Sequence, residues 1–248
     1  MASVTIGIAG WGLPGPDLAL FPPAAAGSNL ARYAAVFNAV EINSSFYRQH
    51  RPETYARWAD SVPATFRFAV KLPRTVTHEK RLHDASAELD RFAAEAGTLG
   101  AKLGWVLVQT PPSLRFDAAA VQAVCCGLQE RLDARQAGAP QLACEARHAS
   151  WFTDEATAVL RQMEAIRVVA DPPAGVPGPF TPTSHNGSYV RLHGSPQIYR
   201  SPYEPVRLEQ VAAWLRDQPG ESLVIFDNTM SGTQASQALL LRDLLRDG

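Results

Sequence analysis

The chain lacks several features that would place it in a functional class at once. Its 248 residues include only three cysteines, and its basic and acidic side chains nearly cancel, leaving a formal net charge of −1. Three cysteines without metal-ligand spacing predict buried, reduced thiols rather than a disulfide framework. Because a near-neutral chain has no basic field for a phosphate backbone, we do not expect a dedicated nucleic-acid-binding protein.

Long apolar runs and cofactor motifs are also missing. No stretch approaches the length that spans a bilayer, and the first residues do not form a basic segment followed by an apolar run. We therefore expect a cytoplasmic protein without a membrane partner. The first predicted strand is not followed by G-x-G-x-x-G, which disfavours a doubly wound dinucleotide-binding sheet, and no cofactor is expected.

Short apolar segments that alternate with helical patterns are the main positive signal. Eight of them are predicted to be strands: Val4–Ala9, Ala39–Asn43, Phe66–Lys71, Leu103–Gln109, Gln141–Ala146, Arg167–Asp171, Tyr189–His193 and Leu223–Asp227. Strands that alternate with helices pair in parallel, so the pattern predicts an α/β fold, a single (β/α)8 TIM-barrel domain over residues 1–248. Between the sixth and seventh strands, the Pro/Gly-rich residues 172–188 predict a loop in place of the helix.

Charged and polar side chains on the inward-facing positions of these strands indicate a site. Side chains alternate along a strand, so every second residue faces the barrel interior. The inward set is predicted to be Glu41, Asn43, Arg67, Lys71, Glu145, Arg147, Tyr189, Arg191 and His193, with Gln109, Asp171 and Asn228 completing the upper ring. Burial of so many ionisable groups is costly unless they are paired, so the set is either a working site or a closed salt-bridge network.

Three residues of this set are candidates for catalysis. Lys71 could hold an anion, act as a base after desolvation, or form a Schiff base. Glu145 could act as a general acid or base, and His193 belongs to the residue type that titrates near neutral pH. We therefore predict acid–base chemistry at the C-terminal mouth of the barrel, without a redox cofactor.

The remaining candidates would bind the substrate. Arg147 and Arg191 offer guanidinium forks suited to phosphate or carboxylate. Tyr47 could stack on a sugar or base, and Ser231 lies in a loop where TIM barrels often bind phosphate, or else caps the next helix. The predicted binding set is Asn43, Tyr47, His78, Gln109, Arg147, Asp171, Arg191, Asn228 and Ser231. The predicted partner is a small anionic ligand, phosphorylated or sugar-like.

Two other interpretations stay open. Glu145, Asp171 and His193 could converge on a divalent ion in a metal-dependent phosphoesterase or nuclease. Several cations at the same mouth would repel a metal, and paired-histidine spacing is missing, so no metal ligand is assigned. The third interpretation is a barrel that binds a ligand without turning it over.

A series of short motifs resembles one known family. In order, the motifs are G-I-A-G-W at 7–11, V-E-I-N-S-S-F-Y at 40–47, F-A-V-K at 68–71 with T-H at 77–78, Q-T-P-P-S at 109–113, E-A-R-H-A-S-W at 145–151, Y-V-R-L-H-G at 189–194 and F-D-N-T at 226–229. The series is similar to that of the YecE-like family, a domain-of-unknown-function family, over nearly the whole chain. This resemblance implies a TIM barrel related to the xylose-isomerase and endonuclease-IV-like barrels, but no particular reaction. The family commonly has asparagine where Asp227 stands.

Overall fold

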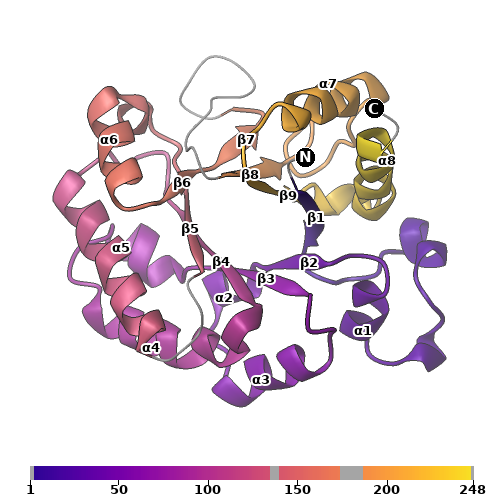
Figure 1. The fold of residues 1–248 in the computed structure, drawn as a ribbon, viewed down its shortest axis with the longest axis horizontal. Helices are drawn as coiled ribbons and strands as arrows, with labels where there is room; N and C mark the ends of the chain where they lie inside the picture. Colours follow the sequence, from indigo (N-terminus) through magenta and orange to yellow (C-terminus); the bar gives the residue numbers. More distant parts are fainter. Residues whose placement is uncertain (1–2, 135–139, 174–186, 247–248) are drawn as a thin grey trace.

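The strands form one parallel sheet that is almost closed into a barrel. The computed structural model describes residues 3–134, 140–173 and 187–246 (Figure 1). In this part of the chain, nine strands pair in the order β6-β5-β4-β3-β2-β1-β9-β8-β7. Their bounds are β1 Ser3–Ala9, β2 Ala39–Ile42, β3 Arg67–Lys71, β4 Leu103–Gln109, β5 Gln141–Glu145, β6 Ile166–Arg167, β7 Val169–Asp171, β8 Gly187–Leu192 and β9 Glu221–Phe226.

The ninth strand arises because the predicted sixth strand is split in two. β6 pairs with β5, and β7 pairs with β8. Only Val168 separates them, and its amide donates to the carbonyl of Cys144 at 2.9 Å. One continuous segment therefore bridges the two ends of the sheet, and the predicted (β/α)8 TIM barrel is confirmed.

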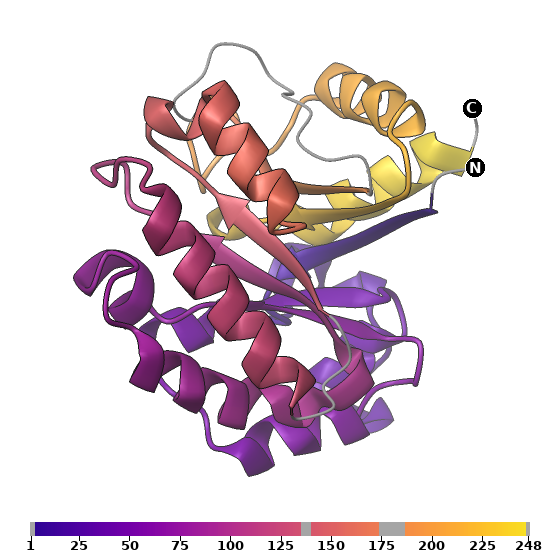
Figure 2. The same cartoon turned by 60° about the vertical axis from the view of Figure 1, so that its left-hand side comes forward.

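Helices cover the outside of the barrel (Figures 1 and 2). They are α1 Asn29–Ala34, α2 Ser44–Tyr47, α3 Pro52–Asp60, α4 Ser86–Ala96, α5 Ala118–Asp133, α6 Asp154–Gln162, α7 Pro205–Arg216 and α8 Gln234–Arg246. Several of these helices begin at residues that favour a helix N-terminus. The side chains of Asp117 and Thr153 accept hydrogen bonds from amides in the first turns of α5 and α6, and Pro52 occupies the first turn of α3.

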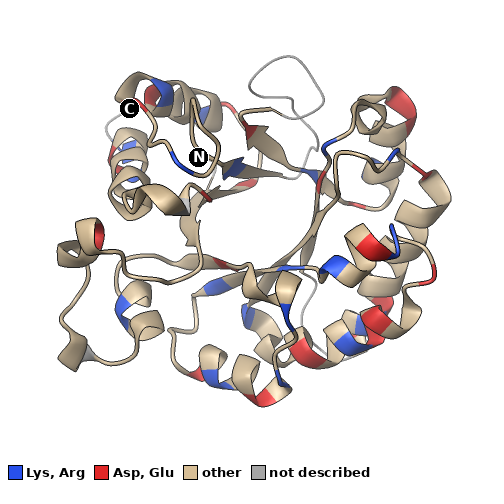
Figure 3. Cartoon of the chain, turned by 180° about the vertical axis from the view of Figure 1, so that it is seen from behind, with Lys and Arg blue, Asp and Glu red and all other residues tan. Residues whose placement is uncertain are grey.

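The protein has two apolar cores, and polar residues occupy the C-terminal ends of the strands. The larger core lies between the strands and the helices. A smaller one fills the barrel interior with side chains that include Trp105, Leu107, Ile166 and Leu223. Charged residues lie mainly on the outer helices, and a few lie on the strands around the ring (Figure 3). Most of these strand residues are buried, so they need partners within the protein.

Three further expectations concern the periphery. Residues 174–186 of the predicted loop over 172–188 lie outside the described residues. Cys125 and Cys144 are buried as predicted, whereas Cys126 is exposed, because it lies beside Cys125 on α5 and off the face that packs on the barrel. No helix within the described ranges is both long enough and apolar enough to cross a membrane.

Candidate functional site

Arg191 is the centre of a buried polar cluster at the C-terminal face of the barrel. β8 directs its side chain inward, where it is fully buried. Its Nε and Nη2 atoms donate to Oε2 and Oε1 of Glu41 at 3.0 and 2.7 Å. Nη2 also donates to Oδ2 of Asp227 at 2.8 Å, and Nη1 donates to the carboxylate of Glu145. The hydroxyl of Tyr189 donates to Oε2 of Glu41 at 2.6 Å. Arg191 therefore holds three carboxylates at once.

Glu145 has both carboxylate oxygens engaged. Oε1 accepts hydrogen bonds from Nε2 of Gln109 at 2.9 Å and from Nε and Nη2 of Arg147 at 3.1 and 2.9 Å, while Oε2 pairs with Arg191. Burial alone would raise the pKa of Glu145, but Arg191, His193 and Arg147 together hold it well below the usual value. Glu145 is therefore ionised at neutral pH and has no proton to donate.

His193 lies between two carboxylates. Its Nδ1 atom is 3.1 Å from Oδ2 of Asp227, and its Nε2 atom is 3.3 Å from Oε1 of Glu145 without the alignment of a hydrogen bond. Burial lowers the pKa of His193, but Glu145 and Asp227 outweigh burial and raise it above the usual value. Burial raises the pKa of Asp227, but Arg191 and His193 lower it by a larger amount. The pKa of Asp227 is therefore below its usual value, and the carboxylate stays ionised. The geometry therefore favours an imidazolium between two carboxylates.

Lys71 is the one cation of this cluster without a carboxylate partner among the described residues. It is only 7% exposed, and its Nζ atom lies 4.1 Å from the centre of the Phe46 ring. Within the described residues its ammonium group makes no hydrogen bond or ion pair. Burial and the charge of Arg191 lower the pKa of Lys71 to about 8, because the nearby carboxylates offset them only in part. A fraction of the lysine is thus neutral near physiological pH.

Further polar and aromatic side chains lie at the edge of this cluster. Asn43 donates from Nδ2 to Oδ1 of Asp227 at 3.3 Å, and its own Oδ1 has no hydrogen-bond partner among the described residues. The His78 ring packs edge-on against Phe46, with the ring centres 4.9 Å apart. Burial, Lys71 and Arg147 lower the pKa of His78, which therefore stays neutral. Tyr47 is 74% exposed beside the same phenylalanine ring.

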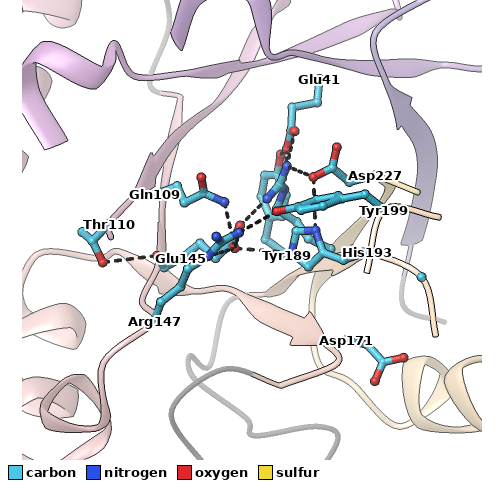
Figure 4. Close-up of polar contacts among 12 residues, drawn as sticks. Glu41, Gln109, Thr110, Glu145, Arg147, Asp171, Tyr189, His193, Tyr199 and Asp227 are labelled. Atoms are coloured by element: carbon cyan, nitrogen blue, oxygen red, sulfur yellow. Dashed lines mark hydrogen bonds and ion pairs between the residues drawn. The ribbon is translucent and has the colours of Figure 1, made fainter. Parts of the chain in front are cut away.

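Several residues of the predicted set do not join the cluster. Asp171 lies apart from it (Figure 4). The neighbouring Val168 packs in the interior core and Val169 in the outer core, so Asp171 shares the outward face of Val169 and pairs with Arg207 of α7. Asn228 also faces outward, and its Nδ2 donates to Oε1 of Gln237 in α8 at 2.8 Å. The inward placement predicted for Asp171 and Asn228 is therefore wrong.

Asp227 takes the place expected for Asn228, and sequence analysis missed it. Leu223 and Ile225 of β9 lie in the interior core, and Asp227 continues their face beyond the end of the strand. Strict alternation from these two apolar residues would have found it. The negative charge of Asp227 contacts Arg191 and His193.

The phosphate site expected ahead of α8 already binds a carboxylate of the chain. Oδ2 of Asp17 accepts hydrogen bonds from the amides of Ala235 and Ser236 at 2.8 and 3.1 Å. The hydroxyl of Ser231 donates to the carbonyl of Asn228 at 2.8 Å and so orders the turn that leads into α8. Asp17 thus satisfies the amides that would bind a phosphate group at this helix terminus.

The proposed metal ligands do not converge. Both oxygens of Glu145 are bound by arginines, and Asp171 pairs with Arg207 on the outside of the barrel, away from His193. In the described part of the chain, no three His, Cys, Asp or Glu side chains are grouped so that they could hold a metal ion. These residues do not fit a divalent ion, and the site instead presents the cationic groups of Lys71 and Arg147.

The barrel with this charged C-terminal face belongs to the class of (β/α)8 proteins. A family model described as "Protein of unknown function DUF72" matches residues 5–248, and the chain belongs to this family. The UPF0759 protein YunF of Bacillus subtilis is 26% identical over 98% of this chain and 94% of its own length. YecE of Escherichia coli is 31% identical over 34% of this chain and 31% of its own. A solved DUF72 family structure from Thermotoga maritima is 26% identical with a TM-score of 0.74, covering 98% of this chain and 99% of that one. The resemblance to the YecE-like family is confirmed.

Proposed function

We propose that this protein is an enzyme that binds a small anionic substrate, phosphorylated or sugar-like, at the C-terminal face of the barrel and acts on it by acid–base chemistry. The observation that carries the proposal is the ammonium group of the largely buried Lys71, which has no carboxylate partner among the described residues although three carboxylates lie in the same cluster. A buried cation is costly unless an anion accompanies it. A substrate anion would supply that charge.

The charges of the cluster support an anionic ligand. The carboxylates of Glu41, Glu145 and Asp227 are bound by Arg191, with Arg147 and His193 as further partners. With His193 protonated, Lys71 is a cation in excess of these pairs. Arg147 also reaches solvent, with 25% of its side chain exposed, so it can contact the ligand together with Lys71.

Proton transfer is assigned to Lys71 and His193. Burial and Arg191 lower the pKa of Lys71 to about 8, which leaves part of it neutral and able to accept a proton. His193, whose pKa is raised by the adjoining carboxylates against the effect of burial, can donate one. Glu145 holds Arg147 and His193 in place rather than transferring protons itself. The Oδ1 atom of Asn43, which has no hydrogen-bond partner among the described residues, can accept a hydrogen bond from a substrate hydroxyl.

Calorimetric titration with inorganic phosphate, glucose 6-phosphate and glucose tests the binding step. We expect the wild-type protein to bind inorganic phosphate and glucose 6-phosphate. Lys71→Met should lower the affinity for both at least tenfold, because a charge-assisted contact is lost. Lys80→Met is the matched control, since Lys80 pairs with Glu88 on the surface at 2.9 Å. Equal phosphate affinity of the Lys71→Met and wild-type proteins would show that the site is assigned wrongly.

A solvent-exchange experiment tests the chemistry. Fructose 6-phosphate incubated in D2O with wild-type protein should lose the NMR signal of a proton next to its carbonyl, and Lys71→Met should not cause this loss. Binding of the sugar phosphate without any exchange or conversion across a panel of ketose and aldose phosphates would contradict catalysis and identify a ligand-binding barrel.

A further inference from the structure

Tyr199 covers the cluster although it lies outside the predicted site. It follows β8 in the loop after His193, and its backbone has a φ of 65°. A left-handed conformation is unfavourable for a bulky residue and persists only when the surroundings hold it. Two hydrogen bonds do so: the Tyr199 amide donates to the carbonyl of His193 at 2.5 Å, and the Met230 amide donates to the carbonyl of Tyr199 at 3.1 Å.

This backbone places the Tyr199 side chain over two residues of the proposed site. The ring meets that of His193 edge-on, with the ring centres 5.4 Å apart. The phenol oxygen lies 3.1 Å from Nη2 of Arg147 (Figure 4). His193 is only 3% exposed beneath this ring. In this arrangement Tyr199 separates His193 from solvent.

The phenol of Tyr199 occupies one of the hydrogen-bond donors of Arg147. Nε and one N–H of Nη2 bind Glu145, and the other N–H of Nη2 points to Tyr199. Nη1 has no hydrogen-bond acceptor among the described residues. Because an oxyanion binds a guanidinium best through two parallel N–H groups, its best position on Arg147 is the edge formed by Nη1 and Nη2. The phenol oxygen already takes half of that edge.

We propose that Tyr199 is a gate on Arg147, and that an oxygen of the anionic ligand displaces its phenol. This gate rests on the proposed function, since it requires an anion at the same face. Displacement frees the Nη1–Nη2 edge for two-point binding of phosphate or carboxylate. It also moves the aromatic ring away from His193 and so gives the bound ligand access to the imidazolium. Tyr199 thereby couples recognition of the anion to exposure of the proton donor.

Removal of the phenol oxygen alone tests the gate. Tyr199→Phe keeps the ring over His193 but removes the acceptor with which the ligand competes. Inorganic phosphate titrated by calorimetry should bind Tyr199→Phe about three- to tenfold more tightly than wild type, as expected for one competing hydrogen bond. Ile198→Ala is the control, because Ile198 is an exposed neighbour in the same loop and should leave the affinity unchanged. Thermal unfolding of each variant verifies that it is folded.

The possible results separate the gate from the proposed function. If Tyr199 had a purely structural role, Tyr199→Phe would bind phosphate as tightly as wild type or more weakly. Tighter phosphate binding by Tyr199→Phe, with Ile198→Ala unchanged, therefore supports the gate. Unchanged or weaker phosphate binding by Tyr199→Phe overturns it, and the proposed function then stands if wild-type binding still depends on Lys71. Absence of phosphate binding in both wild type and Tyr199→Phe overturns the gate and the anion site together.

Discussion

The guanidinium of Arg191 and the carboxylate of Glu41 form a two-point ion pair inside the barrel. The two contacts measure 2.7 and 3.0 Å, and both side chains are fully buried. β8 and β2 are separated in the sheet by β9 and β1, so the pair joins strands that do not hydrogen-bond to each other. Arg191 also binds Glu145 and Asp227. Its charge is therefore required by three buried carboxylates.

Removal of this charge should destabilise the protein strongly. We expect Arg191→Met to lower the free energy of unfolding by about 3–5 kcal/mol, because it leaves buried carboxylates without their cation. Urea denaturation measures the change. Arg74→Met is the control, since Arg74 and Glu79 form an exposed pair that should contribute at most about 1 kcal/mol. Similar stability of the two variants would show that Arg191 is not the centre of the cluster.

His193 should make stability depend on pH in a defined direction. Burial lowers its pKa, but Glu145 and Asp227 raise it by a larger amount, so the pKa in the folded protein exceeds the usual 6.5. A group whose pKa rises on folding contributes stability that is complete below its unfolded pKa and is lost as pH rises through the folded value. The stability difference between wild type and His193→Gln should thus be largest at about pH 6 and shrink as pH increases.

Urea denaturation over a pH series gives this difference directly. His83→Gln serves as the control, because the His83 side chain is 57% exposed and should show a small difference at every pH. A wild-type advantage over His193→Gln that stays constant or grows with increasing pH would contradict an imidazolium between Glu145 and Asp227.

Asp17 should stabilise the start of α8. Its carboxylate accepts hydrogen bonds from two amides of the first turn, which otherwise have no partner within the helix. Asp17→Ala should therefore cost about 1 kcal/mol in the free energy of unfolding. The exposed Asp90, which pairs with Arg131, provides the comparison, and Asp90→Ala should cost less. If Asp17→Ala were no less stable than Asp90→Ala, Asp17 would not be a cap.

Strand alternation predicts most of the cluster from sequence. Glu41, Lys71, Glu145, Arg191 and His193 all lie where alternation with their apolar neighbours places them. Each follows an apolar residue that faces the helices, so the polarity pattern identifies the inward side. The fold follows from the same pattern, because the strands alternate with helices along almost the whole chain.

Alternation fails where both faces of a strand are apolar or where polar residues are consecutive. Val168, Val169 and Ala170 give no polarity contrast, so nothing local shows that Asp171 faces outward. Asp227 and Asn228 are adjacent at a strand end, and only the face of Leu223 and Ile225 distinguishes them.

Long-range contacts are the other source of error. Asp17 and Ala235 are separated by 218 residues, and no local pattern pairs them. Tyr199 reaches Arg147 through a left-handed backbone in a loop, which residue type does not predict. Residues of this kind become visible only when the chain is folded.

The pKa of Lys71 tests the central claim most directly. The chain has three lysines, so protein labelled with 13C at lysine Cε gives few NMR signals. The signal of Lys71 is the one that is missing from the spectrum of Lys71→Met. Because burial and Arg191 act on Lys71, its signal should titrate with a pKa of about 8. Saturating inorganic phosphate should raise that pKa, since an adjacent anion favours the charged amine, and the other two lysine signals serve as internal references. A Lys71 that titrates at its usual value of 10.5 and does not respond to phosphate would contradict an anion site at this face.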